Sequence, residues 1–428
     1  MLLKADLESI SQSHLFKVGV LAFLCRLLVS PISANSWDMY LWFETAEKIV
    51  LKGEVFTFYT SNPSMHYALP PLWGFYLAAV FTLYPAPNSD DLIFRFLAKL
   101  PIILSDIAIA FLVQRYILAV TQDKKKSDLA ATIWLLHPHV FFISGIWGMP
   151  DSISVLFLLL SIYLLFTNRT MSAGVSYGLS VMTKHYTLFA YPFLLTSLFK
   201  RDRNDFIKFL ITSAAVIAAV SLPFLIYDWS HYFESLLLHT EARFPHLRHQ
   251  MSGIYQLISL LHAWKKFRVS SFILTFGFKI LILLEFLSLP LIYYSKLDRG
   301  SELNICCMLP SISFVCLSLN VAPQYLVLPI VFLLIDIFLR DRNRWFLVVS
   351  VIPFFFYFAF AGFFHPPIYY AESVIREAMD SIVGPFSLNI YINTLISLGF
   401  FFGYSAYSIA AFKAVSTGLV DKLRSLLG

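Results

Sequence analysis

Two carboxylates of this 428-residue chain stand at the edges of apolar runs, where charged groups are uncommon. Asp38 lies among aromatic residues in SWDMY at 36–40, and Asp151 lies in GIWGMPDS at 145–152, directly before an apolar run. A carboxylate in such surroundings suits a general base or a cation ligand. The alternative at both positions is an ordinary helix N-cap, since Asp and the neighbouring Ser36 are good capping residues.

Two groups of basic side chains stand where a phosphate could bind. Lys184 and His185 lie at the junction of two apolar segments, and a charge there is costly unless it faces water, a carboxylate or a phosphate. A lysine that extends to the membrane surface is the alternative. The second group, Arg243, Arg248 and His249, indicates a phosphate clamp or, alternatively, a solvated loop that contacts lipid headgroups.

Other polar residues are less decisive. Gln324 and Tyr325 open an apolar run after Pro323, so an amide and a phenol could bind sugar hydroxyls there; a packing tyrosine beside a satisfied amide is the alternative. Asp106 lies inside the apolar run 96–119 and must be paired or face a cavity. No Gly-rich phosphate loop, HExxH, GxSxG or DxD motif occurs, so we expect no cofactor, no metal ion and no nucleic-acid partner.

The composition determines the surroundings of these residues. Hydrophobic residues make up 58% of the chain and charged residues only 14%, against about 25% in soluble proteins. With a mean hydropathy of +0.72, the chain cannot be a water-soluble globule. We predict an all-α, polytopic transmembrane helical bundle. The four cysteines lack metal-site spacing and are expected to be packing residues.

Apolar runs of near-spanning length predict about twelve spans. They cover residues 15–31, 96–119, 128–146, 152–167, 171–183, 186–199, 206–226, 271–294, 302–319, 324–339, 345–364 and 389–412. If the N-terminus is cytoplasmic, every short basic loop falls on the cytoplasmic side, as the positive-inside rule requires. These loops are 124–126, 168–169, 200–203, 296–299, 340–344 and 413–424.

The segments between the spans give the domain organisation. Residues 1–428 are predicted to form one integral membrane domain, with large non-cytoplasmic loops at 32–95 and 228–270 and a cytoplasmic tail at 413–428. The first loop alternates apolar and charged residues, which predicts an amphipathic helix along the membrane surface. Residues 72–84 are interpreted as an interfacial or re-entrant helix, because a further span there would invert every later basic loop.

The order of the motifs resembles that of the GT-C membrane glycosyltransferases, most closely the GPI mannosyltransferase I family. The pieces that carry the resemblance are WDMY and FETA at 37–46, YALPPL at 67–72, KLPIILSD at 99–106, WLLHP at 134–138, WGMPDSI at 147–153, MTKHY at 182–186, RHQMS at 248–252 and PQYL at 323–326. The family's first loop resembles a DxDY pattern, whereas this chain has Ser36 at the first acidic position and keeps only Asp38. That departure argues against a DxD-type metal site and is consistent with a distant, prokaryotic member.

The resemblance implies a function and a site. The activity is an inverting transfer of a hexose, mannose in the family, from a polyprenyl (dolichyl) phosphate donor to a glycolipid or lipid-linked acceptor, with a small membrane subunit as a possible partner. Asp38 would be the catalytic base. The implied donor-phosphate residues are Lys184, His185, Arg243, Arg248 and His249, and the implied sugar or acceptor residues are Glu44, Tyr67, Asp151, Gln324 and Tyr325.

Two other functions fit the same composition. A lipid or sugar transporter or flippase would also be polytopic with a few intramembrane charges, although no half-to-half repeat is visible. A non-catalytic subunit of a glycosylation complex would explain the lost acidic position at Ser36. An enzyme would be a multi-pass protein of the endoplasmic reticulum membrane in a eukaryote or of the cell membrane in a prokaryote, with its active site on the non-cytoplasmic face.

Overall fold

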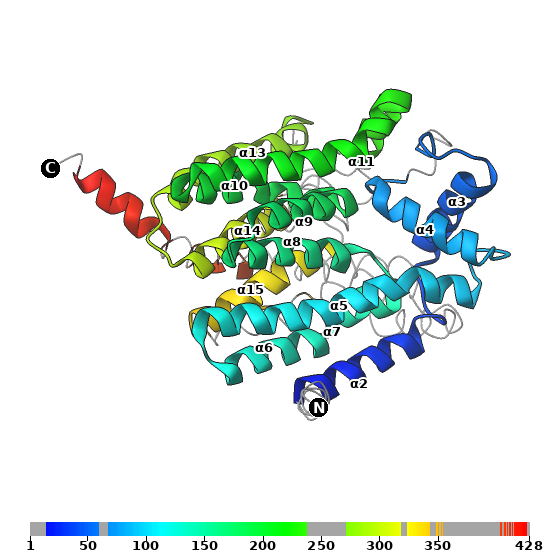
Figure 1. The fold of residues 1–428 in the computed structure, drawn as a ribbon, viewed down its shortest axis with the longest axis horizontal. Coiled ribbons are helices and arrows are strands. Elements are labelled where there is room, and N and C mark those ends of the chain that lie inside the picture. The colour runs from blue at the N-terminus through cyan, green and yellow to red at the C-terminus, as the bar shows by residue number, and fades with distance from the viewer. Residues whose placement is uncertain are drawn as a thin grey trace, which may run out of the picture.

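In the structure, a computed structural model, every regular element among the described residues is a helix, which confirms the predicted all-α class. It describes residues 14–59, 67–237, 271–317, 323–342, 348–349, 351, 353, 403–404, 406–407, 409, 411, 413 and 415–425. The elements are α2 (His14–Val29), α3 (Ser36–Leu51), α4 (Pro71–Leu83), α5 (Leu92–Thr121), α6 (Lys124–Leu136), α7 (Pro138–Phe141), η1 (Phe142–Trp147), α8 (Asp151–Phe166), α9 (Thr170–Thr183), η2 (His185–Ala190), α10 (Tyr191–Arg201), α11 (Arg203–Leu237), α13 (Ser271–Tyr293), α14 (Arg299–Leu317), η4 (Pro323–Leu326) and α15 (Val327–Leu339). Figure 1 shows most of them side by side in one bundle.

The helices match most of the predicted apolar runs, but few are long. Within the described ranges, α5 and α11 are each long and apolar enough to cross a membrane, and α6 together with α7 and η1 would form a third, bent span. The helices α4 and α8, part of α13, and η4 with α15 are apolar but shorter. The number of about twelve spans therefore stays a prediction, and the runs 345–364 and 389–412 lie largely outside the described residues.

The predicted run 128–146 forms a helix that is broken near its middle. The chain bends by 46° between α6 and the following α7 and η1. Pro138 causes the break, because it lacks an amide N–H and disfavours helical geometry at His137, which has φ −63° and ψ 119°. Beyond the bend the chain continues as a π-helix that ends at Trp147.

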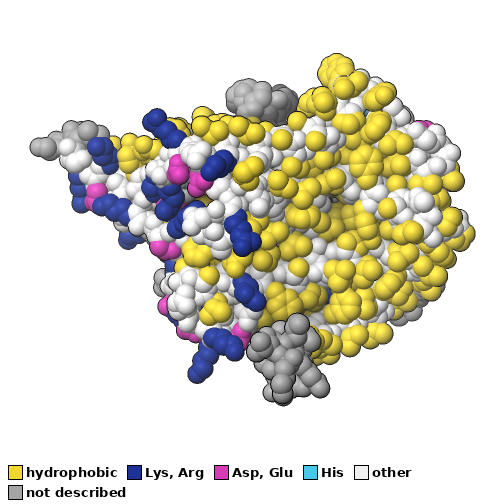
Figure 2. Space-filling model, viewed as in Figure 1, with side chains coloured by type: hydrophobic (Ala, Val, Ile, Leu, Met, Phe, Trp, Pro, Cys, Tyr) yellow, Lys and Arg dark blue, Asp and Glu magenta, His cyan; other side chains and the backbone are white. Residues whose placement is uncertain are grey.

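The basic loops, far apart in sequence, meet at one end of the bundle. Lys126 pairs with Asp341 over 2.6 Å, and Lys296 pairs with Asp421 over 2.8 Å. Arg299 donates to the side chain of Asn168. Figure 2 shows the dark blue Lys and Arg side chains gathered on the left, while the visible face to the right is mainly hydrophobic. We call this the basic end; its position agrees with the shared membrane side that the positive-inside pattern predicted.

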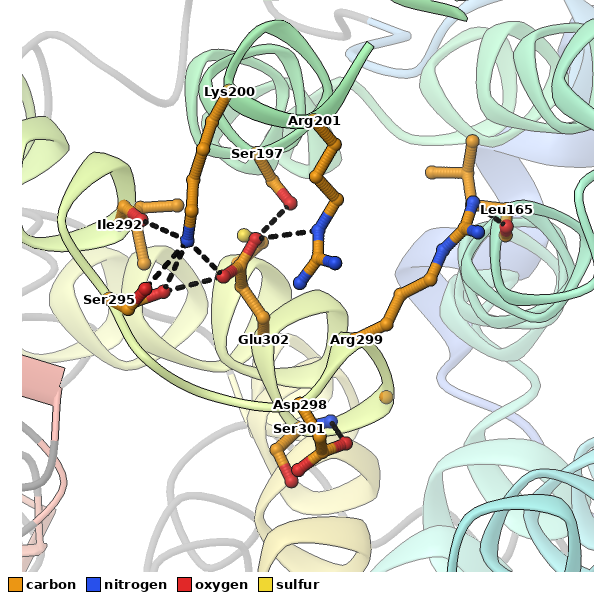
Figure 3. A network of polar contacts seen from close by, with 12 residues as sticks. Leu165, Ser197, Lys200, Arg201, Ile292, Ser295, Asp298, Arg299, Ser301 and Glu302 are labelled. Carbon is orange, nitrogen blue, oxygen red and sulfur yellow. Dashed lines mark hydrogen bonds and ion pairs between the residues drawn. The ribbon is translucent and has the colours of Figure 1, made fainter.

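A buried carboxylate links several helices at the basic end. Glu302 of α14 accepts hydrogen bonds from Lys200 Nζ (2.7 Å), Arg201 Nε (3.2 Å) and Ser197 Oγ (2.6 Å) of α10. Lys200 also donates to the Ser295 carbonyl oxygen over 2.7 Å, which ties in the chain after α13 (Figure 3). Removing one partner of such a pair typically costs about 3–5 kcal/mol, because it leaves a buried charge unpaired.

The helices α3 and α4 lie at the end opposite the basic end (Figure 1). Trp42 of α3 packs edge-on against Trp73 of α4, with ring centroids 5.1 Å apart. Residues 36–51 form the helix expected in the first loop. Residues 71–83 form a short helix beside it, and the interfacial or re-entrant position of this segment stays a prediction.

Candidate functional site

Asp38 is the starting point of the site, and its carboxylate is not used to cap a helix. The N-cap of α3 is Asn35, whose Oδ1 accepts the Asp38 backbone N–H over 3.1 Å. The Asp38 side chain, in the first turn of α3, instead accepts a hydrogen bond at Oδ2 from the indole Nε1 of Trp147 over 2.6 Å. This side-chain hydrogen bond joins the first loop to the end of η1.

The turn after Trp147 directs the chain from η1 into α8. Gly148 has φ +89°, in the left-handed region where glycine is favoured, and its N–H bonds to the Ile143 carbonyl oxygen over 2.8 Å. Asp151 follows as the first residue of α8, and the structure gives no side-chain cap to this helix. Neither Asp38, which is bonded to Trp147, nor Asp151, which follows that turn in the chain, caps a helix with its side chain.

A buried ion pair forms the second part of the site. Lys184, in the extended link between α9 and η2, donates to Asp151 Oδ2 over 3.2 Å. Tyr186 donates its hydroxyl to Asp151 Oδ1 over 3.0 Å. Both side chains of the pair are almost fully buried, so Lys184 does not extend to the membrane surface in this structure.

Aromatic rings border this ion pair. The ammonium of Lys184 lies 5.3 Å from the ring centroid of Tyr325, within range of a cation–π contact. The Tyr325 ring also packs against Tyr186 at 5.4 Å and Phe314 at 5.6 Å between centroids. The adjacent Gln324 is buried, and its Oε1 has no hydrogen-bond partner among the described residues, so it is an acceptor available to a ligand hydroxyl.

The charges of the site act on one another. Asp38 lies in the first loop, outside the expected spans, and burial raises the pKa of its carboxyl above the ordinary value. The Trp147 hydrogen bond and the Lys184 charge oppose this shift, whereas the Asp151 charge adds to it. A carboxylate with a raised pKa is a stronger base than an ordinary one, and it is still ionised at a sufficiently high pH.

The structure does not bring all the predicted residues together. Glu44 accepts a hydrogen bond from the Tyr40 hydroxyl, and its Oε2 lies 3.9 Å from Lys48 Nζ on the same helix, α3. Tyr67 donates to the Pro70 carbonyl oxygen over 3.3 Å and packs in an aromatic cluster with Phe58. His185 is half-buried beside Lys184. The predicted phosphate residues Arg243, Arg248 and His249 lie outside the described residues.

Other residues at or near the site were missed or only partly foreseen. Trp147 and Tyr186 stood within recognised motifs, yet the sequence carried no sign that their side chains bond to Asp38 and Asp151. Asp106 is paired as predicted, with Arg26 Nε at 3.1 Å. Across the described part of the chain, no group of three or more His, Cys, Asp or Glu side chains is placed to hold a metal ion.

Comparisons with known proteins show which proteins this chain is similar to. A model of glycosyltransferase family 87 matches residues 67–318. GPI mannosyltransferase 1 of Candida albicans is 25% identical over 325 residues, which cover 71% of this chain and 75% of the relative. The crystal structure of ArnT from Cupriavidus metallidurans bound to undecaprenyl phosphate has a TM-score of 0.50 and 12% identity, with 94% of this chain and 77% of that chain covered. The structural likeness shows a shared fold, that of a polytopic GT-C membrane protein.

Proposed function

Since the chain belongs to glycosyltransferase family 87 and is a membrane glycosyltransferase, we propose that it transfers mannose from a polyprenyl-phosphate donor to a lipid-linked acceptor, with inversion. The mannosyl group is supported by the similarity to GPI mannosyltransferase 1. The polyprenyl carrier is supported by the fold shared with ArnT, whose structure is bound to undecaprenyl phosphate.

The observation that carries the proposal is the single group of charges formed by Asp38, Asp151 and Lys184. An acceptor hydroxyl has a pKa far above neutral, so a base must take its proton as the oxygen attacks the anomeric carbon. In the proposed reaction Asp38 takes that proton. The new bond forms between the acceptor oxygen and the anomeric carbon, while the bond from that carbon to the phosphate oxygen breaks and its electrons leave with the phosphate.

Lys184 is proposed to stabilise the departing phosphate. Among the described residues its ammonium has one hydrogen-bond acceptor, Asp151 Oδ2, so N–H groups remain for phosphate oxygens. Asp151 and Tyr186 would hold the ammonium in place before the donor arrives. A cation fixed in a dry site stabilises developing negative charge without reorganisation, which favours the transition state over the ground state.

The depth of the site suits a lipid phosphate. Helix α8 has 16 residues and spans about 24 Å from its end near Arg299 to Asp151. A membrane core about 30 Å thick that begins at the basic end would place Asp151 and Lys184 close to its far boundary, where a lipid phosphate lies. We propose that this boundary is the non-cytoplasmic face.

The remaining predicted residues have different degrees of support. Gln324 and Tyr325 stay proposed as sugar or acceptor contacts, because the Gln324 Oε1 atom is buried and available. Arg243, Arg248 and His249 stay proposed as further phosphate ligands. Glu44 and Tyr67 have less support, since their hydrogen bonds are made within the first loop. A small partner subunit remains an untested proposal.

Product formation tests the function directly. Purified protein in lipid nanodiscs is incubated with radiolabelled polyprenyl-phosphate-mannose and a lipid extract, and the labelled product is isolated and identified. We expect a mannosylated lipid whose glycosidic bond has the inverted configuration. Direct use of a nucleotide sugar in place of the lipid donor, or movement of the donor across the bilayer with no glycosidic bond formed, would refute the proposal.

A further inference from the structure

Lys99 of α5 is a fully buried lysine that the reaction described above does not use. Its ammonium donates to backbone carbonyl oxygens: that of Ser30 at 2.9 Å, that of Ile146 at 2.8 Å, and that of Ser33. A further carbonyl oxygen, that of Gly145, lies at 3.4 Å. No carboxylate pairs with Lys99 in the part of the chain that the structure describes. Backbone carbonyl oxygens are therefore the main hydrogen-bond partners of this buried amino group.

The carbonyl groups come from two separate segments. Ser30 and Ser33 belong to the link between α2 and α3, which leads directly into the turn that carries Asp38. Gly145 and Ile146 belong to η1, and the next residue is Trp147. Lys99 thus joins the two chain segments whose side chains form the hydrogen bond between Asp38 and Trp147.

Two neighbouring contacts restrict the same region. Ser144, the residue before Gly145, is bonded through its Oγ to Arg26 Nε over 3.2 Å, and Arg26 is paired with Asp106. Gly148 packs against the stem of Lys99 so closely that a Cβ atom there would lie 2.6 Å from the Lys99 Cε atom. Three consecutive residues of η1, from 144 to 146, are therefore bonded to the buried side chains of Arg26 and Lys99.

We propose that Lys99 is a positioning residue that sets the distance and angle between the Asp38 carboxylate and the Trp147 indole. The proposal rests on the proposed function, in which Asp38 is the base. A side chain that only fills this space could be apolar, and it would not bury an amino group that needs hydrogen-bond partners. The ammonium instead provides several directed hydrogen bonds that an apolar side chain lacks, and these bonds connect the two segments of the site.

Kinetics over a range of pH test this role. The variants are Lys99→Met, Trp147→Phe, the double variant and, as a matched control, Lys200→Met, which removes another lysine bonded to carbonyl oxygens but at the basic end. We expect Lys99→Met to lower kcat about 10- to 100-fold with little change in KM, since a misplacement of about 1 Å can cost about 100-fold in rate. The acidic limb of the kcat/KM profile should move to higher pH in both Lys99→Met and Trp147→Phe, because each weakens the hydrogen bond that stabilises the ionised carboxylate.

The double variant and the control separate positioning from general stability. If Lys99 acts through Trp147, the double variant should be no slower than the worse single variant. Lys200→Met should lower the thermal stability and leave the acidic limb in place. The other groups that act on Asp38, Lys184 and Asp151, are unchanged in all four proteins.

Defined results would overturn the inference. If the rate losses of Lys99→Met and Trp147→Phe multiply in the double variant, Lys99 does not act through this hydrogen bond. The same conclusion follows if the acidic limb of the kcat/KM profile is not shifted in Lys99→Met. Should Lys99→Met fail to fold, Lys99→Gln keeps two N–H donors on a shorter side chain, and a smaller shift of the limb in the same direction is expected. Near-normal transfer by Asp38→Asn would remove the proposed base, whereas an inactive Asp38→Asn together with an unshifted Lys99 variant would overturn the positioning role alone.

Discussion

The indole Nε1 of Trp147 donates a hydrogen bond to Asp38 Oδ2 over 2.6 Å, across 109 residues of sequence. This contact joins the first turn of α3 to the last residue of η1. Because Oδ2 is bonded to the indole, Oδ1 is the oxygen that we expect to take the proton from the acceptor. The predictions below depend on this arrangement and on the neighbouring pair of Lys184 and Asp151.

Replacing Asp38 by Asn should abolish transfer without unfolding the protein. The amide keeps the size of the side chain and can still accept the Trp147 hydrogen bond, but it cannot take the acceptor's proton. Loss of a general base typically costs about 100- to 10,000-fold in rate. Product formation and thermal unfolding should be measured beside Glu47→Gln, a carboxylate change on the same helix. Normal turnover by well-folded Asp38→Asn would exclude this residue as the base.

The pH dependence should report the state of Asp38. Because burial raises the pKa of this carboxyl, the ionised base is lost on acidification at a higher pH than for an ordinary aspartate. We expect kcat/KM to fall as the pH is lowered through that raised pKa and to reach a plateau above it. Initial rates across a pH series measure the limb, and Asp38→Glu provides a comparison that keeps the carboxylate. A profile that stays flat through the range above the ordinary aspartate pKa would contradict this prediction.

Lys184→Met should lower kcat more than it weakens acceptor binding. The benefit of the ammonium grows as negative charge develops on the departing phosphate, so its removal acts mainly on the transition state. One preorganised electrostatic contact is typically worth about 2–4 kcal/mol, or about 30- to 1000-fold in rate. Lys200→Met at the basic end serves as the control. An increase in the acceptor KM at unchanged kcat would instead indicate a role in binding alone.

Transfer should survive chelation of divalent cations. The first loop lacks a DxD pair, and the proposed reaction assigns the phosphate charge to Lys184 and the predicted Arg248. Activity is compared before and after EDTA treatment, then after addition of Mg²⁺ or Mn²⁺. Loss of activity on chelation, with recovery on addition of the metal, would require a metal-dependent mechanism.

The basic end should face the cytoplasm and the α4–α5 loop the opposite side. Lys125 and Asn88 are both exposed. A single cysteine introduced at either position can be labelled in sealed vesicles to show on which side of the membrane it lies. The background needs Cys25 replaced by Ala because it is exposed, whereas Cys306, Cys307 and Cys316 are buried. We expect the Lys125→Cys variant to react only from the cytoplasmic side and the Asn88→Cys variant only from the other. The reverse pattern would invert the proposed topology.

Much of the fold followed from the sequence because it depends on local properties. A chain in lipid must satisfy its backbone polar groups within each segment, so long apolar runs become helices wherever they occur. The bounds of α2, α5, α9 and α14 lie within a few residues of the predicted runs for this reason. The basic loops also met at one end as the charge pattern indicated, because their positions depend only on the alternating direction of the helices.

The partners of the functional side chains were decided by the tertiary structure. Asp38 and Asp151 carried the same capping alternative in the sequence, and only the packed helices show that Asp38 bonds to Trp147 and Asp151 to Lys184. The role of Trp147 was invisible for the same reason. A hydrogen bond between residues 109 positions apart depends on how helices pack and where the chain bends, and local hydropathy carries no information about either. The sequence by itself therefore determined that this protein is a helical membrane protein with charges beside its apolar runs, and the packing of those helices decided which charges meet.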